Sequence, residues 1–160
     1  MILGIQQTIS IEKSGFGDVA GPHSSHAWEQ RKLGDIANSY SGGTPAVGEK
    51  TYYGGAIPFI RSAEITGSGT ELFLTERSLR NSSAKMVTVG DILYALYGAT
   101  SGMVGIARIK GAINQAVLAM KPIVGYDSQF IVQWLRERKQ SIRERVLLRS
   151  FLISCIYCKM

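Results

Sequence analysis

Residues 86–120 read MVTVGDILYALYGATSGMVGIARIKGAINQAVLAM, and this stretch decides the fold. Four short runs in it are rich in β-branched, aliphatic and aromatic residues, and turns that contain glycine separate them. Such residues favour strands, and glycine is common where a chain reverses its direction. The spacing therefore predicts short strands at 86–89, 92–97, 103–109 and 116–120, joined as an antiparallel meander or half-barrel.

The sequence before this stretch is less regular. Residues 1–27 contain several Gly and Ser residues and show weak periodicity, so we expect a weakly ordered leader there. Residues 28–37 (WEQRKLGDIA) predict a short amphipathic segment, and the paired glycines within 39–55 indicate a loop. A short strand is expected at 57–61, at the edge of a sheet, because its proline cannot donate a hydrogen bond to a neighbouring strand.

The sequence after residue 127 changes its period. Apolar residues between 128 and 150 recur at intervals of four, seven and four, which is one stripe of an α-helix. A helix of about 22 residues would be about 33 Å long. A domain of this size cannot cover such a helix, so we expect it to project and to need a partner helix. The apolar tail 151–160 has no predicted role. The stripe consists of Ile131, Leu135, Ile142 and Val146.

The composition restricts the class of protein. The 160 residues include 18 Lys and Arg against 12 Asp and Glu, which gives a net charge of +6. Much of this excess lies within 129–149, and such a cluster either forms a solvated helix face or attracts a polyanion or an acidic partner. Two cysteines near the end do not make a disulfide framework. The sequence has neither an apolar run of about 18 residues nor a secretory signal, so we expect a cytoplasmic protein without membrane contact.

The motifs that could carry catalysis do not have the required spacing. Residues 43–51 approach a phosphate-binding loop, but Glu49 stands where the lysine should follow the second glycine. The two histidines have no third ligand for zinc, and the two cysteines form only half of a zinc-ribbon pattern. Without a credible general base, nucleophile or metal site, we expect a binding protein and not an enzyme.

Side chains suited to reading DNA occur at the predicted strand ends. Arg, Lys, Asn, Gln, Ser and Thr contact phosphates and base edges in protein–DNA complexes. For any one of these residues, the alternative is a structural role in a turn or in the core. The candidate DNA-binding residues are Arg61, Ser62, Lys85, Tyr97, Thr100, Ser101, Asn114 and Gln115.

Several short motifs together resemble one known family. In order, they are WEQRKLGDI (28–36), SGGTP (41–45), YGGAIPFIRS (53–62), NSSAK (81–85), GDI (90–92), YGATSGMVGI (97–106) and NQA (114–116). Each motif is short, but their order and spacing resemble the target recognition domain of type I restriction–modification specificity subunits, in a half-length or truncated form.

The resemblance implies an α/β fold with a β-rich target recognition domain at 28–126, followed by a spacer or dimerisation helix at 127–150. It implies that the chain reads one half of a split double-stranded DNA target. Modification methyltransferase subunits would dock on it and bring S-adenosylmethionine, and through them would come restriction subunits that use ATP. No cofactor is expected on this chain itself.

The resemblance leaves the assembly open. The family usually carries two recognition domains and two helices in one chain, and this sequence contains one of each. A homodimer through the long helix would restore the second half. The alternatives are an interaction module that does not bind DNA and an inactive fragment of a specificity subunit.

Overall fold

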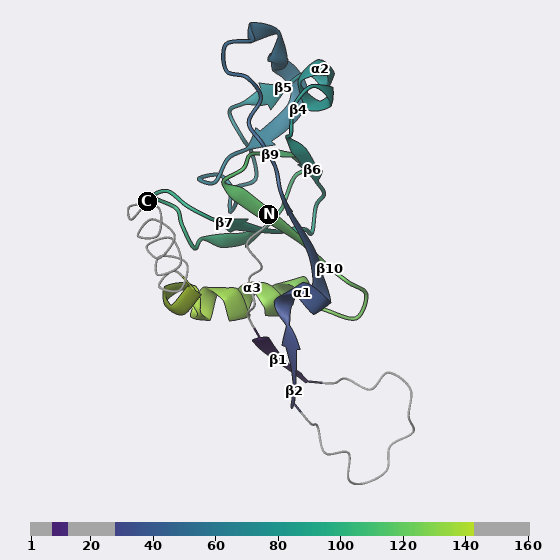
Figure 1. The fold of residues 1–160 in the computed structure, drawn as a ribbon, viewed down its shortest axis with the longest axis vertical. Helices are drawn as coiled ribbons and strands as arrows, with labels where there is room; N and C mark the ends of the chain where they lie inside the picture. The colour runs from purple at the N-terminus through teal and green to yellow at the C-terminus, as the bar shows by residue number, and fades with distance from the viewer. Residues whose placement is uncertain (1–7, 13–27, 143–160) are drawn as a thin grey trace, which may run out of the picture.

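The computed structural model describes residues 8–12 and 28–142, and its strands form three sheets (Figure 1). A two-stranded hairpin lies at the lower end in Figure 1, a four-stranded central sheet lies in the middle, and a four-stranded upper sheet lies toward the top. Helix α3 runs beneath the central sheet. The mixed α/β class predicted from the sequence is confirmed.

The hairpin and the central sheet are antiparallel throughout. The hairpin pairs β1 (Thr8–Glu12) with β2 (Trp28–Lys32). The central sheet has the strand order β3-β10-β7-β8. Its strands are β3 (Ala37–Ser41), β7 (Ile92–Ala95), β8 (Val104–Ile106) and β10 (Val117–Pro122).

The upper sheet is mixed, with the strand order β5-β4-β9-β6. Strands β4 and β9 are parallel, and the other neighbours are antiparallel. Its strands are β4 (Tyr53–Ile60), β5 (Phe73–Leu74), β6 (Lys85–Val87) and β9 (Gly111–Ile113). The helices are α1 (Leu33–Ile36), α2 (Glu76–Arg80) and α3 (Ser128–Glu137), with a 3-10 turn η1 (Lys50–Tyr52) before β4.

The central sheet is buried on both faces. Side chains alternate between the faces of a strand, so Ile92 and Tyr94 pack with α1 and α3, while Leu93 and Ala95 pack toward the upper sheet. Ile113 of β9 joins this second core. Because neither face of β7 meets water, the strand is a continuous apolar run, which is why the sequence predicted it clearly.

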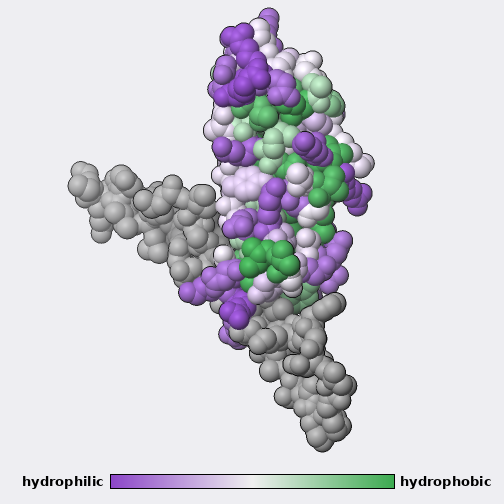
Figure 2. Space-filling view, turned by 90° about the vertical axis from the view of Figure 1, so that its right-hand side faces the viewer, coloured by the Kyte–Doolittle hydropathy of each residue, from purple (hydrophilic) through white to green (hydrophobic). Residues whose placement is uncertain are grey.

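The outer face of the upper sheet has its own small core. Phe59, Leu74 and Ala112 are buried there, and Leu79 of α2 packs against them. Helix α2 begins after Thr75, whose hydroxyl oxygen accepts a hydrogen bond from the backbone N–H of Ser78 at 3.2 Å. Figure 2 shows hydrophilic residues gathered at this upper end and a compact hydrophobic patch lower down, at the height of α1 and α3.

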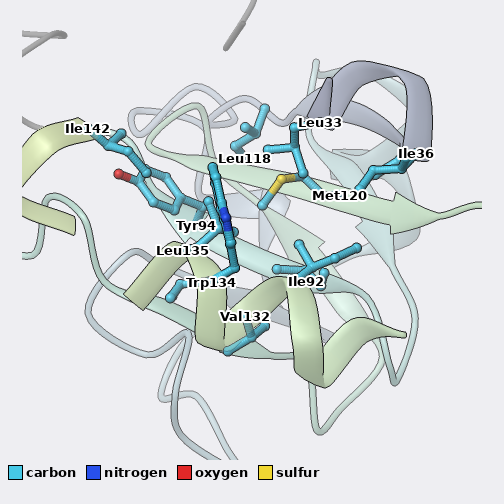
Figure 3. Close-up of a cluster of buried hydrophobic side chains, with 13 residues drawn as sticks. Leu33, Ile36, Ile92, Tyr94, Leu118, Met120, Val132, Trp134, Leu135 and Ile142 are labelled. Atoms are coloured by element: carbon cyan, nitrogen blue, oxygen red, sulfur yellow. The ribbon is translucent and has the colours of Figure 1, made fainter. Parts of the chain in front are cut away.

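Helix α3 packs against the underside of the central sheet. Its first turn is capped by Asp127, whose carboxylate accepts a hydrogen bond from the N–H of Phe130 at 2.8 Å. Figure 3 shows Trp134 and Leu135 directed toward the sheet, in one cluster with Tyr94. The helix is therefore a structural layer of the domain.

This packing differs from the projecting helix that the sequence predicts. Ile131, Leu135 and Ile142 are only 1%, 1% and 2% exposed, and all three belong to the core between α3 and the central sheet. A stripe with helical period looks the same whether it faces a partner helix or the chain's own sheet, and here it faces the sheet. The fourth member, Val146, lies outside the described residues. The described part of the helix thus offers no open apolar seam.

The predicted meander is also corrected. Strand β6 belongs to the upper sheet, and β9, which the sequence did not predict, lies between β6 and β4. Strand β9 has only three residues, and one of them is the glycine that indicated a turn. The strand with Pro58 is not at an edge, because β4 lies between β5 and β9. Its pairing with β9 begins at Phe59, directly after the proline, so the missing N–H removes no bond from that ladder.

The N-terminal predictions are corrected in two places. Residues 28–37 form the end of a hairpin, the single turn α1 and the start of β3, instead of one amphipathic segment. Within the predicted leader, Thr8–Glu12 pairs with β2 as a strand. The remaining residues of the leader and the tail 151–160 lie outside the described residues.

Candidate nucleic-acid interface

The C-terminal end of β9 brings three candidate residues together. Ile113 pairs with Ile60 in the parallel direction, so Arg61 leaves β4 beside Asn114. On the other side of β9, Lys85 pairs directly with Ile113. Three segments that lie far apart in the sequence therefore end at the turn between β9 and β10.

The loop after β3 and the β7–β8 loop begin beside the same β9–β10 turn. Strand β10 pairs Val117 with Ala95 and Leu118 with Ser41, so β7 and β3 both end where β10 starts. The N–H of Leu96 donates to the carbonyl of Ala116 at 2.8 Å, which holds the start of the β7–β8 loop against this turn. We call the candidate residues around it the strand-end surface: Arg61, Ser62, Lys85, Tyr97, Thr100, Ser101, Asn114 and Gln115.

Hydrogen bonds fix the loops of the strand-end surface. The side-chain oxygen of Asn114 accepts from the N–H of Ala116 at 3.1 Å, and the hydroxyl of Ser101 donates to the carbonyl of Leu96 at 3.3 Å. Both residues therefore have the structural role that the sequence left open. Lys85 and Tyr97 extend into solvent, and Tyr97 is 50% exposed.

One contributor to this surface was not singled out from the sequence. The hydroxyl of Thr44 donates to the side-chain oxygen of Gln115 at 2.6 Å and joins the loop after β3 to the β9–β10 turn. The hydroxyl of Tyr40, in β3, donates to the carbonyl of Met86 in β6 at 2.8 Å and so connects the two large sheets. Thr44 lies in the SGGTP motif, which was the available signal.

Arg61 is held by an acidic neighbour. Its guanidinium lies 2.8 Å from a carboxylate oxygen of Glu64, and its backbone N–H donates to the other oxygen at 2.9 Å. The hydroxyl of Thr70 also donates to Glu64, at 3.1 Å. Burial raises the pKa of Glu64, but the hydrogen bonds from Arg61 and Thr70 outweigh it and hold the pKa below its ordinary value of 4.5. This ion pair fixes the direction of the Arg61 side chain.

The lowered pKa of Glu64 gives a pH-dependent prediction. A carboxyl group with a depressed folded-state pKa stabilises the fold above its ordinary pKa, and that contribution is lost as the pH falls through the folded value. We expect Glu64→Gln to lower the melting temperature by about 2 °C at pH 7, and the difference to shrink below pH 4. Glu71→Gln, at the outer end of the same cluster, is the control and should change the melting temperature less, because its side chain is 93% exposed. An equal loss at pH 7 and pH 3 would contradict the assignment.

The described residues contain neither a metal site nor a membrane span. No group of three or more His, Cys, Asp or Glu side chains is arranged to hold a metal ion within 8–12 and 28–142. No helix in the described part of the chain has the length and apolar character needed to cross a membrane.

These features define a small mixed α/β domain with polar loops at its strand ends. The chain belongs to the family of type I restriction modification DNA specificity domains, whose model matches residues 26–149. The specificity subunit of the type I restriction enzyme MjaIX from Methanocaldococcus jannaschii is 28% identical over 120 residues, which cover 71% of this chain and 28% of that protein. The resemblance stated from the motifs is therefore confirmed, and with it the expectation of a DNA specificity domain in place of an enzyme.

Solved structures of specificity subunits share the fold. The HsdS subunit from Thermoanaerobacter tengcongensis has a TM-score of 0.57 at 18% identity and covers 76% of this chain and 31% of its own. A second solved structure, which concerns complex assembly and conformational transition of the type I R-M system, has a TM-score of 0.53 at 19% identity. The match covers 69% of this chain and 27% of that chain. The S subunit from M. genitalium has a TM-score of 0.50 at 20% identity, covering 71% and 27%. This chain spans less than a third of each relative.

Proposed function

We propose that this chain reads one half of a split double-stranded DNA target through the strand-end surface. The supporting observation is that the ends of β4, β6, β7 and β9 meet at one turn and present donors there. Readers of DNA need this arrangement, because base edges are contacted by several side chains at once while phosphates fix the orientation. Membership of a DNA specificity family supports the same conclusion.

The residues of the strand-end surface would make different kinds of contact with DNA, according to their surroundings. Lys85 is exposed and makes no ion pair within the described residues, which suits a phosphate contact. Gln115 is exposed and keeps its amide N–H groups for a base edge, while Thr44 occupies its oxygen. Arg61 is pre-oriented by Glu64, so its guanidinium would lose little rotational freedom on binding.

A selection experiment tests this reading. The full chain is mixed with a library of randomised duplexes, and the retained sequences are compared between the wild type and its variants. We expect Gln115→Ala or Thr100→Ala to relax the preference at one or two positions, since each base contact is worth about 1–3 kcal/mol. Lys85→Ala should weaken binding to every duplex and reduce the salt slope by about 0.9. Arg80→Gln, on α2, is the control and should retain both preference and affinity.

Two results would contradict the proposal. Failure of the wild type to retain any duplex at low salt would remove DNA reading altogether. An unchanged selected sequence in the Gln115 and Thr100 variants would place base recognition elsewhere. In the second case, footprinting on the wild-type complex shows which part of the duplex is protected.

We further propose that the chain docks modification methyltransferase subunits and, through them, restriction subunits. S-adenosylmethionine and ATP would then be bound by those partners. Two observations support this proposal. The chain belongs to the specificity-domain family, and it shares its fold with a solved structure that concerns complex assembly of the type I R-M system. A co-purification with the methyltransferase subunit tests it, and the absence of a complex would count against it. A homodimer through Ile131, Leu135 and Ile142 is not proposed, because these side chains are buried in this chain's own core.

A further inference from the structure

A second positively charged site lies at the opposite end of the β7–β8 hairpin. A groove of about 560 Å³ is bounded by β8, the turn before β7 and the face of α3 that carries Gln129, Val132 and Arg136. Arg108 and Arg136 line it, together with the polar side chains of Thr66 and Gln129. None of the described residues that line the groove carries a carboxylate, so its only charged side chains are the two guanidinium groups.

The donors of this groove are available to a ligand. Arg108 is exposed and makes no ion pair within the described part of the chain. Arg136 donates one N–H to the carbonyl of Val104 at 3.3 Å, which fixes its guanidinium against β8, and it makes no ion pair with a carboxylate of the described residues. Thr66 and Gln129 are both exposed. Two guanidinium groups beside a hydroxyl and an amide suit the oxygen atoms of a phosphate.

The backbone adds a further donor. Strand β8 is the edge strand of the central sheet. The N–H of Ala95 donates to the carbonyl of Met103, just before β8, and the N–H of Ala107, just after β8, donates to the carbonyl of Asp91. The backbone groups of odd-numbered residues along β8 therefore face β7. The N–H of Ile106 therefore points away from the sheet, on the side where the groove lies. At this strand edge, the N–H of Ile106 is therefore a further donor for an anion beside the two arginines.

We infer that this groove binds backbone phosphates of the same duplex whose bases face the strand-end surface; this inference rests on the proposed function. Strand β7 has four residues, so about 13 Å separates its two ends. A major groove is about 12 Å wide, so one duplex can contact both ends of the hairpin. The loop that begins at Arg61 reaches the groove at Thr66 and connects the two contacts. The groove would supply affinity and orientation without selecting a sequence.

Fluorescence anisotropy on the full chain tests the inference. Binding of one fixed 30-bp duplex and of the selected pool is followed across salt concentrations for the wild type, Arg108→Gln and the control Arg80→Gln. We expect Arg108→Gln to weaken binding to every duplex by about 3- to 10-fold at 0.1 M salt and to lower the salt slope by about 0.9. The selected sequence should not change. Arg108→Gln removes no hydrogen bond or ion pair within the described residues, so the fold should be retained, and Arg136→Gln then serves as a second variant.

The outcomes separate this inference from the proposed function. If the wild type binds and Gln115→Ala changes the selected sequence, but Arg108→Gln matches Arg80→Gln, then only the phosphate groove is wrong. If Arg108→Gln changes the selected sequence without changing affinity, the groove reads bases and the inference is overturned. Binding of polyglutamate that depends on Arg108, with DNA binding unaffected, would also overturn it and assign the groove to an acidic protein. A wild type that binds no duplex overturns both proposals.

Discussion

Leu135→Ala is expected to lower the free energy of unfolding by about 2–5 kcal/mol. Leu135 is 1% exposed and packs in the core between α3 and the central sheet (Figure 3), so truncation leaves a cavity that its neighbours fill only in part. Chemical denaturation followed by circular dichroism measures the change. Gln133→Ala, on the exposed face of the same helix, is the control and should stay within about 0.5 kcal/mol of the wild type.

This measurement also decides between two roles of the apolar stripe. If the apolar stripe binds a partner helix, Leu135→Ala should cause a small loss of stability in the isolated chain and a large loss of self-association. A structural layer gives the reverse. A change below about 1 kcal/mol for Leu135→Ala would show that α3 is not packed as described and would restore the partner helix.

Gly42→Ala is expected to cost about 3 kcal/mol, at the upper end of the range for overpacking. A Cβ atom at position 42 would overlap the backbone carbonyl of Ile113, which cannot move without shifting the β9–β10 turn. Since this turn carries Asn114 and Gln115, we expect DNA binding to fall together with stability. Denaturation and anisotropy on the same preparation measure the two effects.

Gly48→Ala provides the matched control in the same loop. A Cβ at position 48 would meet no atom within 4 Å, and its φ lies outside the left-handed region, so the substitution should be nearly neutral. A Gly42→Ala variant as stable as Gly48→Ala would contradict the close approach of the loop after β3 to β9. The comparison separates steric overlap from the general effect of removing a glycine from a loop.

The parts of the fold that could be predicted are those with a clear apolar pattern in the sequence. Strand β7 was predicted from its apolar run, and α3 was predicted from its apolar stripe. The order of the strands could not be predicted, because pairing depends on contacts between residues far apart in the sequence. The parallel pairing of β4 with β9 joins Phe59 to Ala112, and no local pattern indicates it.

The candidate site was predicted residue by residue but not in its geometry. Strand-end positions placed Lys85 and Asn114 on the surface, while their convergence follows from the register of β9 with its two neighbours. Arg108 and Arg136 were missed as a pair because 28 positions separate them and each alone resembles an ordinary exposed cation. The direction of the apolar stripe was wrong for a related reason, since periodicity identifies a buried face without identifying what buries it.

The loops around the β9–β10 turn are closed by hydrogen bonds within each loop: the N–H of Ala116 donates to Asn114, and the hydroxyl of Ser101 donates to the carbonyl of Leu96. The hydrophobic layers lie elsewhere, between and beneath the sheets. The tips between these closures can therefore be exchanged without repacking the interior. Grafting a tip from a relative would change the side chains presented at the strand-end surface in one step, and the packed interior would be retained.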